Sequence, residues 1–496
     1  MSIPAEQAET AAFLRGLAGA DPVETHISLV YLGADTVWKL KKSVRLSFLD
    51  FTNIADRRRF CERELALNAP AAPGMYRDVA PVVRRPDGTL ALGEADGGTV
   101  IDWVLRMARV PTADFLEVMA TEARIDPPLL DTIADAVAAY HQALPPLPEA
   151  HPDMRAIAAG NAQAALAAGL PKDAVDAWAG AIHATLTRLE PWLTRRAADG
   201  FVRRTHGDLH LGNLCVWRGK PTLFDALEFD EALATIDLGY DLAFLLMDLE
   251  HRVGRPAANR VLNRYAARTG DAALVRGLPA FLSLRALVRA HVAASGGHTA
   301  AALSYLDSAG LYLRPAEPLV VAIGGLPGTG KSTLARALAP ELGPAPGALI
   351  VRSDEIRKRQ FGVAPEERLP PDAYTPSASR SVFATLADTV RIAAESGQAV
   401  IADATFMNHE HRTLASNAAR DAGVPFRGLW LHAPLPILEQ RVAARTGDAS
   451  DATVAVLRSA AEHDPGAGGW LPIDAADATA ALSQARNSLH PPPQAC

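Results

Sequence analysis

A glycine-rich loop in the second half of this 496-residue chain limits its fold more than any other segment. Residues 325–332 fit the pattern G-x-x-x-x-G-K-[ST]. The apolar run 319–323 precedes them, and residues 334–342 follow with a helical pattern. A loop of this kind between a strand and a helix turns its backbone N–H groups toward phosphate oxygens. We therefore predict a P-loop that binds a nucleoside triphosphate.

Two side chains of this loop have predicted roles. Lys331 is expected to place its charge on the β- and γ-phosphates of ATP, and the hydroxyl of Ser332 is expected to bind Mg²⁺. The chain has seven lysines against 42 arginines, so a lysine at this position is informative. The phosphate cradle is expected to include Gly325, Gly328, Gly330 and Thr333.

A short segment with two prolines, 313–318, is interpreted as a joint between a domain at 1–314 and a domain at 319–496. After the joint, predicted strands alternate with helices, which is typical of a parallel sheet in an α/β P-loop fold. The strands are expected at 319–323, 348–352, 398–402, 427–432 and 470–473.

The first domain has a different pattern. A strand pair is predicted at 26–46, with its turn at 33–35, and a helix at 55–68. Most of 112–195 and 256–312 is alanine-rich and helical, and short strands are expected within 201–231. We predict an α+β domain with a small β-containing lobe and a larger helical lobe.

A second group of polar residues lies in this domain. Asp208, Asn213 and Asp225 follow one another at spacings suited to phosphoryl transfer. One carboxylate can orient a substrate hydroxyl, while the amide and the second carboxylate hold Mg²⁺. We therefore assign Asp208 as a candidate catalytic base, and Asn213 and Asp225 as candidate metal ligands.

A kinase-like domain with these residues also needs a lysine on a strand and a glutamate on a helix that pairs with the lysine. Lys39 and Lys41 share one face of the predicted second strand, because side chains alternate along a strand. We favour Lys39 paired with Glu64, and keep Lys41 and Glu62 as alternatives.

The run from His206 to Asn213, with the following Asp225, resembles the aminoglycoside phosphotransferase and choline kinase family over roughly residues 1–312. The resemblance implies a protein-kinase-like fold, with Asp208 as base and Asn213 and Asp225 on Mg²⁺. By the same resemblance, Asp241 and His141 are structural residues. No Gly-x-Gly-x-x-Gly loop precedes the lysine strand, so a domain of this fold without catalysis stays open.

In the second domain, candidate residues follow the predicted strands. Asp354 comes after the second strand, where parallel sheets present ligands. Residues 319–480 resemble small P-loop kinases, namely polynucleotide kinase, gluconate kinase and zeta-toxin-like phosphotransferases. This implies that Asp354 is a base and that Arg352 or Arg357 touches the acceptor. A second interpretation is that Ser353 or Asp354 caps a helix at 355–360.

Two further features complete the predicted P-loop site. Asp403 ends the third strand and fits a carboxylate that holds Mg²⁺ together with Ser332. Arg441 and Arg445 are spaced four residues apart, so they can share one helix face and stabilise charge during transfer. Arg441 is the candidate catalytic residue of this pair, and a solvated arginine face is the alternative.

Composition bounds the partners. The net charge is −7, which argues against broad nucleic-acid binding. Three widely spaced cysteines form no disulfide framework, and the first residues lack a signal-peptide pattern, so we expect a cytoplasmic protein with no membrane segment.

The two groups of residues together resemble bacterial proteins in which an aminoglycoside phosphotransferase-like domain is fused to a P-loop kinase domain. We expect an ATP- and Mg²⁺-dependent phosphotransferase with two ATP sites and small hydroxyl acceptors. In the main alternative only the P-loop domain is active, and its acceptor includes nucleic-acid 5′-hydroxyls as a less favoured case. The kinase-like domain is then a binding or regulatory module. Another alternative is an ATPase switch without an acceptor.

Overall fold

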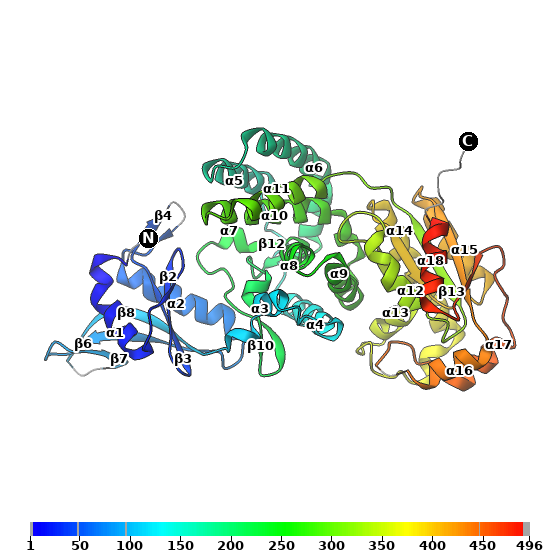
Figure 1. The fold of residues 1–496 in the computed structure, drawn as a ribbon, viewed down its shortest axis with the longest axis horizontal. Coiled ribbons are helices and arrows are strands. Elements are labelled where there is room, and N and C mark those ends of the chain that lie inside the picture. The colour runs from blue at the N-terminus through cyan, green and yellow to red at the C-terminus, as the bar shows by residue number, and fades with distance from the viewer. Residues whose placement is uncertain (1–2, 47–48, 95–96, 446, 490–496) are drawn as a thin grey trace. The chain divides into compact units, whose positions relative to one another are not determined.

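The computed structural model describes residues 3–46, 49–94, 97–445 and 447–489. It divides the chain into two compact units. Unit 1 consists of Met1–Pro152 and Pro191–Leu245, and unit 2 consists of Asp153–Glu190 and Leu246–Cys496. This division differs from the predicted domains, 1–314 and 319–496, which remain a prediction. Figure 1 labels most of the helices and some of the strands.

Unit 1 contains an antiparallel sheet with the strand order β1-β2-β3-β8-β6-β7. Strands β2, β3, β6, β7 and β8 are labelled in Figure 1. The predicted strand pair is confirmed, because β2 and β3 pair with Val30 opposite Lys39. Gly33 closes the turn, where a Cβ would lie 2.7 Å from the ring of Trp38. The strands are β1 (Val23–Glu24), β2 (Ser28–Leu32), β3 (Thr36–Lys41), β6 (Tyr76–Arg84), β7 (Leu90–Leu92) and β8 (Thr99–Ala108).

Several elements of unit 1 had no counterpart in the sequence prediction, among them β6, β7, β8 and the helix α1 (Ala8–Ala18). The apolar alternation of β8 is interrupted by Asp102, which is buried. Arg57 and Gln7 donate to the Asp102 carboxylate at 2.8 Å each. A charged residue at an inward position removes the pattern by which a half-buried strand is predicted.

The remaining elements of unit 1 include helices that begin at capping side chains. Helix α2 begins after Asn53, whose side chain accepts from the N–H of Ala55 at 2.9 Å. Helix α4 begins at a proline after its cap Asp126. The elements are β4 (Arg45–Leu46), β5 (Leu49–Asp50), α2 (Ile54–Asn68), α3 (Leu116–Thr121), α4 (Pro127–Ala143), β9 (Val202–Arg204), β10 (Leu214–Trp217), β11 (Lys220–Leu223), α7 (Glu231–Ala234), β12 (Thr235–Asp237) and the first part of α8 (Leu238–Arg252).

Unit 2 contains a helical part and a sheet. In the helical part, Trp178 of α6 donates to the hydroxyl of Ser283 of α10 at 2.8 Å. The helices are α5 (Met154–Ala167), the first part of α6 (Lys172–Ala198), α9 (Arg255–Thr269), α10 (Leu278–Ser295) and α11 (Thr299–Tyr312).

The sheet of unit 2 is parallel, with the order β14-β15-β13-β16-β17. All five predicted strands are confirmed as β13 (Val320–Gly325), β14 (Leu349–Arg352), β15 (Val400–Asp403), β16 (Phe426–His432) and β17 (Leu471–Asp474). Residues of α12 and α18 form one core with the inward side chains of these strands, among them Val321 and Ile323. The helices are α12 (Lys331–Leu338), α13 (Ser353–Gln360), α14 (Pro376–Glu395), α15 (His409–Asp421), α16 (Leu435–Ala443), α17 (Val454–Ala461) and α18 (Ala478–Leu489).

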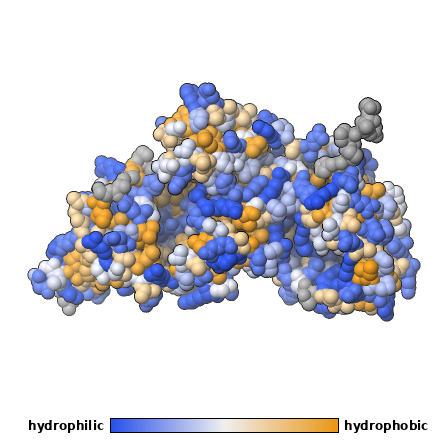
Figure 2. Space-filling view, viewed as in Figure 1, coloured by the Kyte–Doolittle hydropathy of each residue, from blue (hydrophilic) through white to orange (hydrophobic). Residues whose placement is uncertain are grey.

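The surface mixes hydrophilic and hydrophobic residues, as Figure 2 shows for one face. Within the described residues, no helix has the length and the apolar composition that a bilayer-spanning helix needs.

Gly428 on β16 is expected to be essential for packing, because a Cβ there would overlap the indole of Trp470. We predict that Gly428→Ala destabilises the sheet of unit 2 by about 1–3 kcal/mol. The control is Gly160→Ala on α5, where an added Cβ meets no atom within 4 Å. Thermal unfolding should show a lower Tm for Gly428→Ala and an unchanged or higher Tm for Gly160→Ala. Equal Tm values would contradict the packing argument.

Candidate functional site

The P-loop of unit 2 has the conformation that its sequence predicts. Gly325 has φ 139°, and a Cβ at Gly328 would lie 2.8 Å from the carbonyl oxygen of Leu438. Lys331 opens α12, and its ammonium donates to the carbonyls of Gly325 and Leu326 at 2.9 and 3.0 Å. Burial lowers the pKa of Lys331, and the carboxylates of Asp403 and Asp354 only partly offset this effect. The ammonium of Lys331 is therefore held inside the loop that is expected to bind the phosphates.

A cavity of about 1090 Å³ opens beside this loop. Its volume is at the upper end of ordinary ligand sites and leaves room for a nucleotide and a second substrate. The predicted site residues that line it are Gly328, Gly330, Lys331, Ser332, Thr333, Asp354, Asp403 and Arg441. Residues separated by more than a hundred positions in the sequence thus line the same cavity of unit 2.

Asp403 connects the P-loop to the neighbouring strand. The hydroxyl of Ser332 donates to Asp403 Oδ2 at 2.6 Å, as expected for two residues that share a metal site. Nε of Arg352 donates to the same oxygen at 3.1 Å. Arg352 also pairs with Glu355 at 3.0 Å and with Asp448 at 2.9 Å.

These three carboxylates determine what Arg352 can do. Burial alone would lower the pKa of Arg352, but Glu355, Asp403 and Asp448 outweigh burial and raise that pKa. Arg352 is not among the residues that line the large cavity, whereas Arg357 is. Of the two arginines proposed to touch an acceptor, the geometry favours Arg357.

Asp354 lies on the cavity wall as the second residue of α13. Burial raises the pKa of its carboxyl group above the ordinary value, although the guanidinium of Arg352 opposes that effect. The alternative in which Ser353 or Asp354 caps the helix is wrong, because Arg352 occupies the cap position and no side chain bonds there. Asp354 lines the cavity instead.

Arg441 and Arg445 do not form the predicted pair on one helix, because α16 ends at Ala443. The guanidinium of Arg441 donates to the carbonyls of Ala475 and Ala476 at 2.8 Å each, so it holds the loop after β17. Arg445 lines the cavity, and its buried NH1 has no hydrogen-bond partner in the described part of the chain. This geometry favours Arg445 over Arg441 as the arginine that meets phosphate.

In unit 1, Lys39 joins two predicted partners. Its ammonium lies 2.7 Å from Glu64 Oε1 and 2.6 Å from Asp225 Oδ1. Burial alone would lower the pKa of Lys39, but the carboxylates of Asp225 and Glu64 outweigh it and hold the pKa well above its usual value. The structure therefore brings together the favoured lysine, the favoured glutamate and a candidate metal ligand.

The two alternative residues, Lys41 and Glu62, have different surroundings and do not pair with each other. Lys41 is fully buried between Glu64 Oε2 at 2.8 Å and Glu228 Oε1 at 2.5 Å, whereas Glu62 pairs with Arg58 at the surface. Glu228 was missed by sequence reasoning. Its position three residues after Asp225 gave a weak signal, because nothing local shows that its carboxylate faces a buried lysine.

The loop that carries Asp208 is fixed by its own side chains. The amide of Asn213 donates to the backbone carbonyl of Asp208 at 2.8 Å and to Oδ2 of Asp208 at 2.9 Å. Asp225 adopts φ 61°, and its N–H donates to the hydroxyl of Tyr76 at 2.9 Å. Asp208 and Asn213 thus adjoin each other, and the residue before Asp225 contacts the same loop, because the N–H of Phe224 donates to the carbonyl of Asn213 at 3.1 Å.

Asp241 and His141 stabilise the loop that carries Asp208 through hydrogen bonds near its start. The carboxylate of Asp241 accepts from the N–H of Gly207 at 2.8 Å and from that of His206 at 3.3 Å. Nε2 of His141 lies 3.0 Å from the same carboxylate. The structural roles expected for Asp241 and His141 agree with these contacts.

Two donor sets fit Mg²⁺. Among the described residues, no three His, Cys, Asp or Glu side chains gather in the manner of a protein-only metal cage. Mg²⁺ in kinases needs only one or two protein ligands, because water and substrate phosphates complete the octahedron. Asn213 with Asp225, and Ser332 with Asp403, supply oxygen donors of that kind.

Family models match both halves of the chain. Residues 81–278 match the model described as "Phosphotransferase enzyme family", and residues 320–463 match the model described as "AAA domain". The chain therefore combines a phosphotransferase-family domain with a P-loop domain. Both expected resemblances are confirmed at this level.

Individual relatives are more distant. An uncharacterised protein of Mycobacterium tuberculosis is 29% identical over 466 residues, which is 89% of each chain. An adenylyl-sulfate kinase of Myxococcus xanthus is 31% identical over 120 residues, which is 24% of this chain and 59% of the kinase.

The fold is also similar to solved structures. A gluconokinase from Sinorhizobium meliloti has a TM-score of 0.24 and 22% identity, covering 36% of this chain and 98% of its own. A choline/ethanolamine kinase family protein from Mesorhizobium loti has a TM-score of 0.37 and 14% identity, covering 62% of this chain and 95% of its own. Both scores are low, so the family models rather than these structures identify the domains.

Breaking the buried ion network of unit 1 is expected to be costly. Glu64→Gln removes the carboxylate that Lys39 and Lys41 share, so each buried ammonium loses one of its two anionic partners. We expect the free energy of unfolding to fall by about 1–3 kcal/mol. The matched control, Glu62→Gln, lies two positions away on the same helix at the surface, and should change it by less than about 0.5 kcal/mol. Urea unfolding of the two variants measures the difference. If the free energy of unfolding of Glu64→Gln falls no further than that of Glu62→Gln, the network does not stabilise the unit.

Proposed function

We propose that the protein is an ATP- and Mg²⁺-dependent phosphotransferase with two nucleotide sites, each of which transfers a phosphoryl group to a hydroxyl of a small molecule. The observation that carries the proposal is the convergence of Lys331, the Ser332–Asp403 pair and Asp354 on one cavity. Phosphoryl transfer needs little covalent help from the protein, because positioning and charge neutralisation supply most of the rate.

In the P-loop site, the hydroxyl oxygen of the acceptor forms a bond to the γ-phosphorus of ATP, and the bond from that phosphorus to the leaving ADP breaks. Asp354 accepts the proton that the hydroxyl loses. Lys331 and Arg445 face the negative charge that spreads over the phosphate oxygens. Mg²⁺, held by Ser332 and Asp403, would neutralise part of that charge when bound. In unit 1, Asp208 accepts the corresponding proton, with Lys39 on the phosphates.

The acceptor at the P-loop site is proposed to carry an anionic group. Arg357 and Arg368 line the same cavity as Asp354. Arg357 packs its guanidinium over Tyr374, 4.9 Å from the ring centroid, and its buried Nε has no partner in the described residues. A carboxylate, sulfate or phosphate on the acceptor would pair with these arginines.

A nucleic-acid acceptor is supported less well. Apart from Arg357, the basic residues near Asp354 that could form a groove are already engaged. Arg352 holds three carboxylates, Lys358 pairs with Asp451 at 2.8 Å, and Arg359 donates to the carbonyl of Ala267 at 2.8 Å.

Two variants test the two sites separately. With a library of small hydroxyl compounds as acceptors, Lys331→Met and Asp208→Asn should each reduce ATP-dependent transfer at their own site roughly 10²- to 10⁴-fold. Their controls are Lys220→Met and Asp199→Asn, which change exposed residues. Labelled phosphate on the product measures the loss.

The result also decides between the alternatives. Transfer that disappears in Lys331→Met but is unchanged in Asp208→Asn for every acceptor would leave only the P-loop site active. ATP turnover that needs no acceptor and survives Asp354→Asn would instead indicate an ATPase switch.

The pH dependence of the P-loop site follows from the burial of Asp354. Because its pKa is raised, its carboxylate takes up a proton at higher pH than the usual carboxyl value of about 3.9. We expect kcat/KM in the Asp208→Asn background to fall on acidification through that raised pKa, and Asp354→Asn to remove this acid limb. An acid limb that persists in Asp354→Asn would assign the base elsewhere.

A further inference from the structure

Strand β14 is at one edge of the unit-2 sheet and pairs with β15 on one side only. On that side the N–H of Leu349 donates to the carbonyl of Ala399 at 2.9 Å. Backbone groups of successive residues point to opposite sides of a strand, so the N–H of Ile350 points away from the sheet. Ile350 is largely buried, and an unpaired N–H there would be costly.

Helix α9 supplies the missing partner. The side-chain oxygen of Asn263 accepts from the N–H of Ile350 at 2.6 Å, and its amide nitrogen donates to the carbonyl of Ala348 at 3.2 Å. Asn259, one helical turn earlier, donates to the same carbonyl at 3.1 Å and is buried. The side chain of Asn263 thus makes the donor and acceptor contacts that a backbone peptide of another strand would make.

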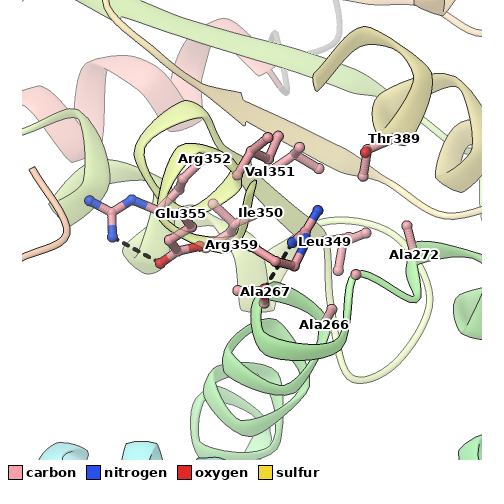
Figure 3. A pocket seen from close by; sticks show the side chains of 12 residues that line it. Ala266, Ala267, Ala272, Leu349, Ile350, Val351, Arg352, Glu355, Arg359 and Thr389 are labelled. Atoms are coloured by element: carbon pink, nitrogen blue, oxygen red, sulfur yellow. Dashed lines mark hydrogen bonds and ion pairs between the residues drawn. The ribbon is translucent and has the colours of Figure 1, made fainter. Parts of the chain in front are cut away.

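The same helix also contacts the elements that follow β14. Arg359 of α13 donates to the carbonyl of Ala267 at 2.8 Å, a bond drawn in Figure 3. Arg264 pairs with Glu366 at 2.8 Å. The space that remains between α9, β14 and α13 is about 20 Å³, enough for one water at most. This junction is a packed contact and not a ligand site.

We propose that Asn263 is a positioning residue of the P-loop site, an inference that rests on the proposed function. Asn263 fixes Ile350, and the chain continues from there through Arg352, which holds Asp403, to the candidate base Asp354. The P-loop follows β13, whereas the hydrogen bonds from α9 reach β14 and the residue before it. Residues 255–269 lie within the segment that matches the phosphotransferase family, so one family's segment supports the other family's site.

The proposal predicts a selective defect in the full-length protein. Asn263→Ala should lower kcat for transfer at the P-loop site on the order of 10- to 100-fold, because a small misplacement of a catalytic group is costly. Binding of a non-hydrolysable ATP analogue should not change, since the phosphate cradle is intact. Hydrogen exchange at the Ile350 amide should become faster by roughly tenfold or more.

A second variant and a control complete the design. Asn263→Asp keeps an oxygen for the N–H of Ile350 but loses the donor to Ala348, so it should recover part of the rate and of the exchange protection. Asn417→Ala, on α15 outside the cavity, should leave the rate, the analogue binding and the Ile350 exchange at wild-type values.

Three outcomes would overturn the proposal. A lower Tm with wild-type kcat would make Asn263 purely structural. Wild-type exchange at Ile350 in Asn263→Ala would show that the contact does not hold the strand. Weaker analogue binding in step with kcat would indicate a general loss of the site. Wild-type turnover that is insensitive to Lys331→Met would instead refute the proposed function, and the Ile350 exchange would still test the contact.

Discussion

The buried guanidinium of Arg352 is the group on which the P-loop site depends. It holds Asp403 from β15, Glu355 from α13 and Asp448 from the segment after α16. A buried charge is tolerated only when it is paired with good geometry, so removing one partner leaves a large uncompensated cost. Arginine suits this position because its planar fork can meet several carboxylates at once. The candidate metal ligand Asp403, the helix that carries the candidate base Asp354 and the segment with Asp448 are therefore fixed relative to one another by one side chain.

Unit 1 uses a comparable arrangement with the charges reversed. Glu64 is the central carboxylate, and it is shared by Lys39 and Lys41, which also reach Asp225 and Glu228. The two lysines face three carboxylates, so this set carries an excess of negative charge. A divalent cation at Asp225 would compensate for it. In both units an ion network holds the catalytic candidates in place, and in both networks the carboxylates outnumber the cations that pair with them.

Most of the site could be predicted because its residues follow strong local patterns. Each strand of the parallel sheet is an apolar run, and Lys331, Asp354 and Asp403 come at or after strand ends. Lys39 could be predicted because the chain contains so few lysines. The arginine proposed to contact phosphate was less predictable. Arg445 lies beyond the end of α16, and the predicted pairing with Arg441 assumed a helix that continues to residue 445.

What the sequence could not show depends on contacts between distant residues. β8 was missed because Asp102 interrupts its apolar pattern, and the reason for that aspartate is Arg57, 45 positions earlier. Asn263 is 87 positions from Ile350, and a polar residue in an exposed-looking helix gives no sign of a strand partner. Asp208 and Asn213 were found because both belong to one short loop.

The covering of β14 by α9 has a consequence for self-association. Open sheet edges offer unpaired backbone groups to which a strand of another molecule can add. At one edge of the unit-2 sheet, Asn259 and Asn263 occupy those groups. At the other edge, β17 is short and contains Pro472, which has no N–H to donate. Separating the two family segments at the joint after α11 would uncover the first edge, so the helix also protects the sheet from aggregation.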